Sequence, residues 1–514
     1  MLTILNYFRK KYKVIVLITI CVLYFLTIRG LPGNLYPNEQ GRLKAVANVP
    51  PFESSLERGR FAQLISLAEE STFSVDKYKD FIRPDIAWFS GHYYPAFPPG
   101  VTIASLPLYV IGVMFGNNQL ISYATTIFIT LTTCYLVLLC CEELNLSKYI
   151  SILVTLFLAL GTNLWVYSVT LSAHPYSALL AITCLYLYIR IQKSDKKFKF
   201  LVILWFVYSF ALFIDYPNLL TLAPFIFAAN LTLLKVVDSE DALKFTFKSI
   251  GIYSIIGFLP VLVLYVLFSQ SLFGRPIAFT NTYNLQRLQI QHIPFNEKHL
   301  SNSLFLKQSY SNRFQILRSI RGIEVLLVSR DRGLFFYSPL FILSILGVIK
   351  LIRRRSRLWL VICASFALNL IIYATFDDPW GGWSFGPRYL VASLPLLTVL
   401  VAIYLNSSYK KNLVKFFTFS SILYGFFISL SGVLTTNVLP PSVEAVGLNM
   451  SDYYSLSFQY LSNGKISSYL FGEYLHKYMN GYVFYSLIST LFITCLISLL
   501  LINNYLAKHE DKFF

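Results

Sequence analysis

The chain has 514 residues, of which 56% are hydrophobic and 13% charged, and its mean hydropathy is +0.59. Apolar runs of about 20 residues, the length that crosses a bilayer, recur through it and exclude a soluble globular protein. The formal net charge of +18 comes largely from short basic connections, such as 190–199, 350–357 and 409–415. Short loops of this kind stay cytoplasmic, so the charge indicates orientation in a membrane and no nucleic-acid partner.

We predict an all-α polytopic membrane protein with about 12 transmembrane helices. The ranges that keep every short basic loop inside are 14–30, 119–141, 149–168, 174–191, 200–214, 218–236, 249–272, 333–350, 358–376, 389–405, 413–434 and 482–503. Residues 99–116 are short and carry Pro107, so we expect them to form a helix lying in the outer interface. This assignment predicts a multi-pass protein of the cell membrane, with the bacterial plasma membrane as the expected location and both termini cytoplasmic.

Three long segments then face outward, at 30–118, 273–332 and 435–481. Long connections are uncommon unless they are functional or disordered, so we expect the chemistry on this face. The chain is accordingly divided into three parts. These are a transmembrane module 1–272 with the first outer loop 30–118, a long outer loop 273–332, and a C-terminal bundle 333–514 with the outer loop 435–481.

The first outer segment contains "ESSLERGRFAQLISLAEE", residues 53–70. Apolar residues such as Phe61, Leu64 and Ile65 recur at helical spacing, which predicts an interfacial helix. Glu57 falls at its amino-terminal edge, where a carboxylate is favoured by the helix dipole. Glu57 is therefore either a capping acid paired with Arg60 or a functional carboxylate facing the outer surface.

The stretch "RPDIAWFSGHYYPAFPPG" at 83–100 combines Asp85 and His92 with Trp88, Tyr93 and Tyr94. Aromatic faces with a few polar groups suit a sugar or a lipid headgroup. An interfacial aromatic belt, which membrane proteins form without catalysis, has the same composition. The stretch alone leaves both interpretations open.

His174 and Asp215 lie at the outer mouths of two predicted spans. Ionisable groups at membrane depth are costly and favour a functional role, although at the edge a hydrated structural histidine is the alternative. With Glu57 and Asp85 they could form an outer cluster that positions a hydroxyl or holds one divalent cation. No pair of these residues lies on one helical face, so the sequence does not require the cation.

Of two later outer segments, one carries two tryptophans and one arginine, and the other carries seven arginines. "DDPWGGWSFGPRYL" at 377–390 offers Trp380, Trp383 and Arg388, beside glycines that let backbone approach a ligand. The forked guanidinium groups of arginine suit phosphate. The alternative for 377–390 is an interfacial aromatic belt, and the alternative for 273–332 is a solvated basic loop near anionic lipid heads. The segment 273–332 carries Arg275, Arg287, Arg313, Arg318, Arg321, Arg330, Arg332, His292 and His299.

In this order of segments the chain resembles the GT-C superfamily of membrane glycosyltransferases, in the branch of protein O-mannosyltransferases and lipid A aminoarabinose transferases. The resemblance covers the layout of roughly the first 240 residues and the long loop at 273–332. The family has an acid three positions before Arg-aromatic, which corresponds here to Glu57, Arg60 and Phe61. Arg58 stands where the family usually has a second acid.

Two further family elements are altered in this chain. The family's Tyr-Phe-Glu-Lys-Pro-Pro element looks like "YPAFPPG", with Ala96 and Phe97 replacing its acidic and basic residues. The family's later Asp-Pro looks like His174-Pro175. These departures put metal or phosphate contacts at both places in doubt.

The resemblance implies transfer of a sugar from a polyprenyl-phosphate donor to an acceptor hydroxyl at the outer face, normally with inversion. The acceptor would be a lipid, a glycan or a protein, and membrane lipids would surround the enzyme. Glu57 would be the general base or orient the hydroxyl, and Arg388 with loop arginines would stabilise the departing phosphate. The other substrate-binding candidates are Arg60, Asp85, His92, Tyr93, Tyr94, His174, Asp215, Trp380 and Trp383, with Trp88 beside them.

Three other functions remain open from the sequence. A transporter or flippase of a lipid-linked or anionic substrate would place charges in the middle of spans and show repeat symmetry. A polymerase or ligase of surface polysaccharide would favour a large outer loop late in the chain. A non-catalytic membrane subunit on the same scaffold would tolerate the missing acids.

Overall fold

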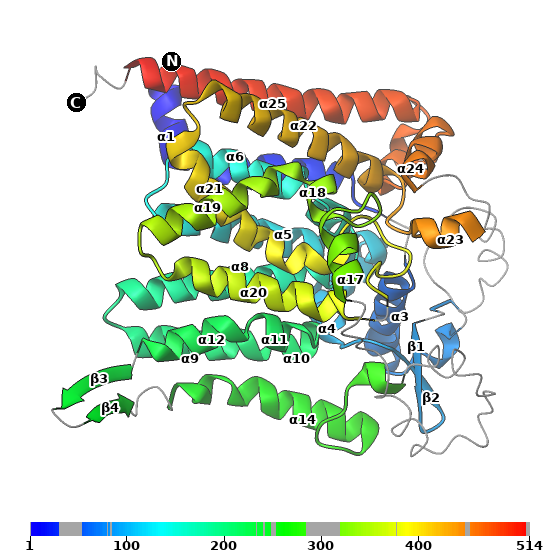
Figure 1. Cartoon of the computed structure of the whole chain (residues 1–514). Coiled ribbons are helices and arrows are strands. Elements are labelled where there is room, and N and C mark those ends of the chain that lie inside the picture. Colours follow the sequence, from blue (N-terminus) through cyan, green and yellow to red (C-terminus); the bar gives the residue numbers. More distant parts are fainter. Residues whose placement is uncertain are drawn as a thin grey trace.

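The computed structural model describes residues 2–29, 54–79, 81–82, 85–232, 234–239, 242–247, 253–283, 319–376, 378–447 and 453–509. The predicted residues Arg287, His292, His299, Arg313 and Arg318 lie outside this part of the chain. The described residues form a bundle of helices that run roughly alongside one another (Figure 1). Long apolar sequences form these helices because a backbone surrounded by lipid must satisfy its own hydrogen bonds.

Helices occupy each predicted span, several of them in two pieces. The bundle consists of α1 (Leu2–Leu26), α5 (Asn118–Glu143), α6 (Lys148–Leu160), α7 (Leu164–Ser168), α8 (His174–Lys193), α9 (Lys197–Ser209), α10 (Ala211–Ile214), α11 (Asn218–Thr221), α12 (Ala223–Leu231), α14 (Leu259–Phe273), α18 (Leu334–Tyr337), α19 (Ile342–Arg353), α20 (Leu358–Ala374), α21 (Leu394–Ser408), α22 (Asn412–Leu434) and α25 (Gly481–His509). Within the described residues, five stretches are long and apolar enough to cross a membrane, at 118–143, 197–214, 388–408, 412–434 and 481–501. The number of spans therefore stays a prediction.

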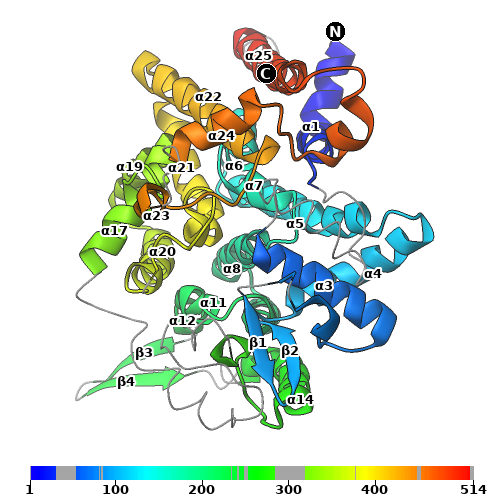
Figure 2. The ribbon, with the colours of Figure 1, turned by 90° about the vertical axis from the view of Figure 1, so that its right-hand side faces the viewer.

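The two ends of the bundle differ. The connections α8–α9, α19–α20 and α21–α22, which carry the basic residues, lie at the same end as both termini (left in Figure 1). The opposite end is covered by a cap, seen end-on in Figure 2. The cap contains α3 (Ser55–Glu70), β1 (Ile86–Phe89), β2 (His92–Pro95), α17 (Ser319–Leu327), α23 (Ser442–Gly447) and α24 (Tyr453–Ser462).

The predicted helix in the first outer segment is confirmed as α3. Residues 59–66, with Phe61, Leu64 and Ile65 among them, are all buried, so this part of the helix has no exposed face. The helix ends before Ser71, whose φ of 54° is left-handed. The short helix expected at 99–116 is α4 (Gly100–Met114), which packs against both α3 and α5. A Cβ at Gly100 would lie 2.4 Å from the carbonyl oxygen of Phe213, so this glycine lets α4 pack tightly on α10.

The all-α expectation is wrong at two hairpins. Strand β1 pairs antiparallel with β2, and their turn at Ser90 and Gly91 has positive φ at both positions, as two-residue hairpins prefer. Strand β3 (Leu234–Ser239) pairs with β4 (Ala242–Phe247), where the predicted span 218–236 overran the end of α12. In β4, residues 243–247 alternate apolar and polar side chains, a pattern of period two that favours strands.

Candidate active site

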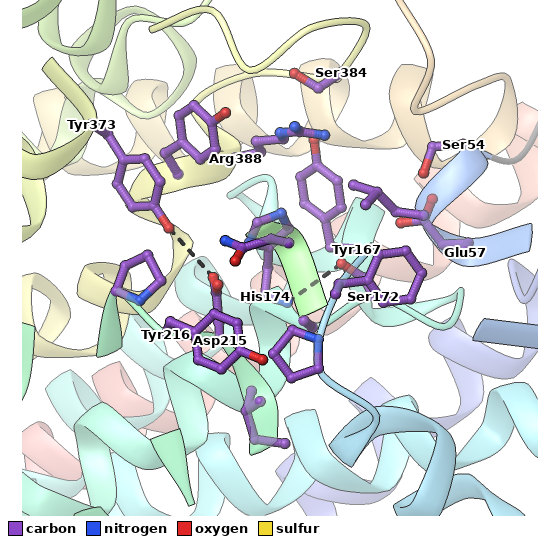
Figure 3. Close-up of a pocket in the computed structure, with 18 of the residues that line it drawn as sticks. Ser54, Glu57, Tyr167, Ser172, His174, Asp215, Tyr216, Tyr373, Ser384 and Arg388 are labelled. Carbon is purple, nitrogen blue, oxygen red and sulfur yellow. Dashed lines mark hydrogen bonds between the residues drawn. The ribbon is translucent and has the colours of Figure 1, made fainter. Parts of the chain in front are cut away.

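A cavity of about 470 Å³ lies between the cap and the bundle. Its walls come from both halves of the chain, from Ser54 at the start of α3 to Asn437 beyond the end of α22. Figure 3 shows Glu57, His174, Asp215 and Arg388 approaching it from separate elements. The structure thus brings together six of the residues singled out in the sequence, namely Glu57, Arg60, His174, Asp215, Trp383 and Arg388.

Glu57 stands in the first turn of α3 and is only 2% exposed. Its Oε2 atom has no hydrogen-bond partner among the described residues. Burial raises the pKa of Glu57, while the positive charges of Arg60 and Arg388 act in the opposite direction. A carboxyl group with a raised pKa and an unpaired oxygen is suited to accept a proton from a hydroxyl near neutral pH.

Arg60 follows Glu57 on the same helix and is fixed in two ways. Its Nη1 donates to the carbonyl oxygen of Leu171 at 2.9 Å, and its guanidinium lies 4.4 Å from the ring centre of Phe97. Phe97, which replaces a basic residue of the family element, therefore provides a cation–π contact. A Cβ at Gly59 would come within 2.9 Å of the Phe97 ring, so glycine is needed between the two charged residues for this packing.

Asp215 lies at the end of α10 and accepts a hydrogen bond from the Tyr373 hydroxyl at 3.3 Å. Desolvation raises the pKa of Asp215 to about 6, against the opposing effects of Arg60, the Tyr373 hydrogen bond and Arg388. Tyr373 in turn stacks on Tyr389 with their ring centres 4.0 Å apart. This carboxyl group can therefore be protonated or ionised near neutral pH.

His174 begins α8 and meets the edge of Tyr167, with 5.0 Å between the ring centres. The Tyr167 hydroxyl donates to the carbonyl oxygen of Phe385 at 2.8 Å and accepts from its backbone N–H at 3.1 Å. Tyr167 therefore connects α7 to the turn that leads into Arg388. No motif or spacing in the sequence distinguishes Tyr167 as a site residue.

The glycines of "WGGWSFGPR" are needed for the turn itself. Gly381, Gly382 and Gly386 all have positive φ, of 74°, 58° and 59°. A Cβ at Gly381 would lie 2.7 Å from Nε of Arg388. The sequence predicted that a ligand approaches the backbone closely at these glycines. At Gly381, the group that approaches the backbone closely is the Arg388 side chain. The glycines thereby set the position of Arg388 in the cavity wall.

Arg332 donates hydrogen bonds to the backbone of this turn. It is fully buried, and its Nε and Nη2 donate to the carbonyl oxygens of Trp380 (2.6 Å) and Gly382 (2.9 Å). Nη2 also donates to the carbonyl oxygen of Leu439 at 3.1 Å. Of the described loop arginines Arg275, Arg321, Arg330 and Arg332, none lines the cavity. Arg388, the arginine of the 377–390 turn, does line it.

The remaining predicted residues lie away from the cavity lining. Asp85 accepts a hydrogen bond from the Ser55 hydroxyl at the start of α3, and exposed His92 contacts Asp76 at 2.7 Å. Tyr94 packs near Phe273, with ring centres 6.0 Å apart. Tyr93 and Trp88 are buried in the hairpin, and Trp380 contacts the guanidinium of Arg321 at 5.4 Å. These residues build the cap around the site.

The described residues of the cavity lining include two carboxylates and one imidazole, those of Glu57, Asp215 and His174. No group of three or more His, Cys, Asp or Glu side chains that could hold a metal ion occurs among the described residues. The two carboxylates of the cavity, Glu57 and Asp215, are both influenced by the guanidinium groups of Arg60 and Arg388. The negative charges of these two carboxylates are thus offset by the two guanidinium groups.

Comparison with known proteins gives likeness in structure only. No protein-family model and no curated protein sequence matches the chain. An oligosaccharyltransferase of Archaeoglobus fulgidus, with a tethered acceptor peptide, is similar over 82% of this chain and 55% of its own, with a TM-score of 0.49 and 11% identity. ArnT from Cupriavidus metallidurans, bound to undecaprenyl phosphate, is similar over 94% of this chain and 78% of its own, with a TM-score of 0.45 and 13% identity.

Both similar proteins are membrane glycosyltransferases of the GT-C superfamily, the class that the sequence resembles. The chain spans little more than half of the Archaeoglobus enzyme, 55% of its length.

Proposed function

We propose that the chain is a glycosyltransferase that moves a sugar from a polyprenyl-phosphate donor to an acceptor hydroxyl at the outer face of the membrane. The observation that carries this proposal is the meeting of Glu57 and Arg388 in one cavity. One supplies a buried carboxylate oxygen without a partner among the described residues. The other supplies a fixed positive charge, which a departing phosphate requires.

The reaction follows from these two groups. The acceptor hydroxyl oxygen attacks the anomeric carbon while its proton passes to Oε2 of Glu57. The bond between the anomeric carbon and the phosphate oxygen breaks, and its electron pair leaves with the polyprenyl phosphate. Arg388 stabilises the charge that develops on this phosphate. A single displacement of this kind inverts the anomeric configuration.

The cavity also provides a place for the prenyl chain. Leu220, Ile372 and Phe376 line one flank of it, and Leu220 is 58% exposed. Apolar side chains at the bundle surface suit a polyprenyl tail, because the tail then remains in contact with lipid. The phosphate lies next to Arg388, and the sugar extends into the polar part of the cavity towards Glu57.

The test uses membranes that contain the overproduced chain, with radiolabelled undecaprenyl-phosphate glucose, mannose, galactose and arabinose as donors. Wild type should transfer label from one of them, and Glu57→Gln should reduce the rate by about 10²- to 10⁴-fold, as expected for loss of a general base. Transfer by wild type should also fall as the pH is lowered through the raised pKa of Glu57.

His92→Gln is the control, because His92 is an exposed polar residue of the cap outside the cavity. It should leave transfer unchanged. Full activity of a well-folded Glu57→Gln variant would contradict the role of Glu57. Failure of wild type to consume any donor would instead favour a transporter or a non-catalytic subunit.

A further inference from the structure

Asn437, in the wall of the cavity, has a side-chain amide without a hydrogen-bond partner among the described residues. Asn437 is 1% exposed and lines the cavity. Neither Nδ2 nor Oδ1 has a hydrogen-bond partner among the described residues. Buried amides are normally paired, and one that is left open on both sides needs an explanation.

The backbone around Asn437 is firmly held. Helix α22 ends at Leu434, and the hydroxyl of Thr435 donates back to the Ser431 carbonyl oxygen at 2.6 Å. The Val438 N–H donates to the Thr436 hydroxyl at 2.9 Å. The backbone that carries Asn437 is therefore held by the residues on both sides of it.

The same loop is attached to the turn that carries Arg388. The carbonyl oxygen of Leu439 accepts from the Ser384 N–H at 2.9 Å and from Nη2 of Arg332 at 3.1 Å. Ser384 and Arg388 line the cavity together with Asn437, and Figure 3 shows both of the first two side chains at its border. The open amide thus belongs to the wall where the proposed function places the phosphate and the sugar.

A second asparagine shows that an unpaired amide is not sufficient. Asn163 is also 1% exposed, and its Nδ2 and Oδ1 also have no partner among the described residues. It lies between α6 and α7 and is not part of the cavity lining. The difference between the two residues is access to the cavity.

We propose that Asn437 binds hydroxyl groups of the donor sugar, donating to one from Nδ2 and accepting from another with Oδ1. This inference rests on the proposed function. A pair of sugar hydroxyls supplies one acceptor and one donor, which matches both halves of the amide. A phosphate offers acceptors only and would leave Oδ1 unpaired, and a prenyl chain offers neither. Asn437 is therefore a residue that determines sugar specificity.

The test separates the sugar from its lipid. Thermal unfolding of the purified full chain in detergent is followed with undecaprenyl phosphate, and then with the undecaprenyl-phosphate sugar that wild type transfers. Wild type should be stabilised more by the sugar-bearing lipid. Asn437→Leu, which keeps the side-chain size, should retain the shift given by undecaprenyl phosphate and lose the additional shift. Its affinity for the sugar-bearing lipid should fall about 10- to 100-fold.

Asn163→Leu is the matched control, because it makes the same change at an equally buried amide outside the cavity, and it should keep the additional shift. Without ligand, Asn437→Leu should unfold at the same temperature as wild type or higher, because a buried polar group without a partner has been removed. Asn437→Asp keeps Oδ1 but loses the donor. It should lose part of the additional shift, and it provides the same test if the leucine variant does not fold.

An additional shift of wild-type size in both Asn437 variants would overturn the assignment while leaving the proposed function intact. Equal loss in the Asn163 and Asn437 variants would overturn it as well, because a general packing effect would then explain both. If neither lipid stabilises wild type, the proposed function itself fails, and this inference fails with it.

Discussion

Tyr167 and Phe385 are joined by two hydrogen bonds, one to the carbonyl oxygen and one from the N–H of Phe385. Tyr167 belongs to α7, in the first half of the chain, and Phe385 belongs to the turn before Arg388, in the second half. A single hydroxyl thus satisfies both backbone groups of a buried residue. The position of Arg388 relative to His174 and Glu57 depends on this connection.

Tyr167→Phe removes only that hydroxyl. It leaves the N–H and the carbonyl of Phe385 buried and unpaired, which should destabilise the protein by about 1–3 kcal/mol. The turn should also shift, so transfer should decrease beyond the loss of folded protein. Tyr149→Phe is the comparison, because it removes a hydrogen bond of 2.8 Å to Tyr409 outside the cavity. Thermal unfolding and transfer rates of the two variants would separate the effects, and equal activity in both would contradict the prediction.

Gly381→Ala should impair transfer more than stability. Its Cβ would lie 2.7 Å from Nε of Arg388 and 3.1 Å from the Tyr389 ring, so the guanidinium must move. Gly91→Ala has the same backbone strain, since Gly91 has a φ of 89°, but nothing lies within 4 Å of its Cβ. Both variants should lose about 1 kcal/mol of stability from the left-handed conformation. Transfer assays should show a loss only for Gly381→Ala, and a similar loss for Gly91→Ala would refute the steric explanation.

Arg332→Lys should destabilise the fold although it preserves the charge. A lysine cannot reproduce the planar fork that donates to Trp380, Gly382 and Leu439 together. The Leu439 carbonyl keeps the Ser384 N–H as a donor and the Trp380 carbonyl keeps the Ser384 hydroxyl, so the main loss is the donor to the Gly382 carbonyl. The free energy of unfolding should therefore fall by about 1–3 kcal/mol. Arg330→Lys, at an exposed neighbouring position, should change little. Yields and unfolding temperatures in detergent test this, and equal stability of the two variants would show that the fork is dispensable.

Asp215→Asn should change how stability depends on pH. The pKa of Asp215 in the folded chain is raised from 3.8 to about 6, so the folded state binds more protons than the unfolded state between these values. The wild type therefore loses stability as the pH rises from 4 to above 6. Asparagine does not titrate, so this contribution disappears in the variant, which should gain unfolding temperature over wild type between pH 5 and pH 7.5. A constant difference across that range would contradict the raised pKa.

The sequence located the helices and six of the cavity-lining residues because polar residues are scarce in an apolar chain. Each of four residues lies next to an apolar stretch, at the end opposite the basic loops: Glu57, His174, Asp215 and Arg388. Their positions relative to the predicted spans therefore indicated that all four lie on the same side of the membrane. The same reasoning could not decide which residues of the aromatic stretch at 83–100 line the cavity. Its residues alternate in a hairpin, and composition does not say which of them face a ligand.

The open amide of Asn437 and the role of Arg332 in holding the 377–390 turn were not predicted, for a different reason. The surroundings of both residues depend on contacts between residues far apart in the chain, such as those from Arg332 to Trp380 and Leu439. An isolated asparagine after a span, or one more arginine in a basic loop, carries no local pattern that distinguishes it from its neighbours. The sequence therefore assigned phosphate binding to the loop arginines as a group.

The order in which the cavity walls occur along the chain has a consequence for biosynthesis. The lining begins at Ser54 and is complete only with Asn437. A growing chain inserted into the membrane from its amino terminus thus carries Glu57 long before it carries the turn and the loop that complete the cavity. The cavity, and with it the site of the proposed transfer, therefore forms only after most of the bundle has been synthesised and assembled.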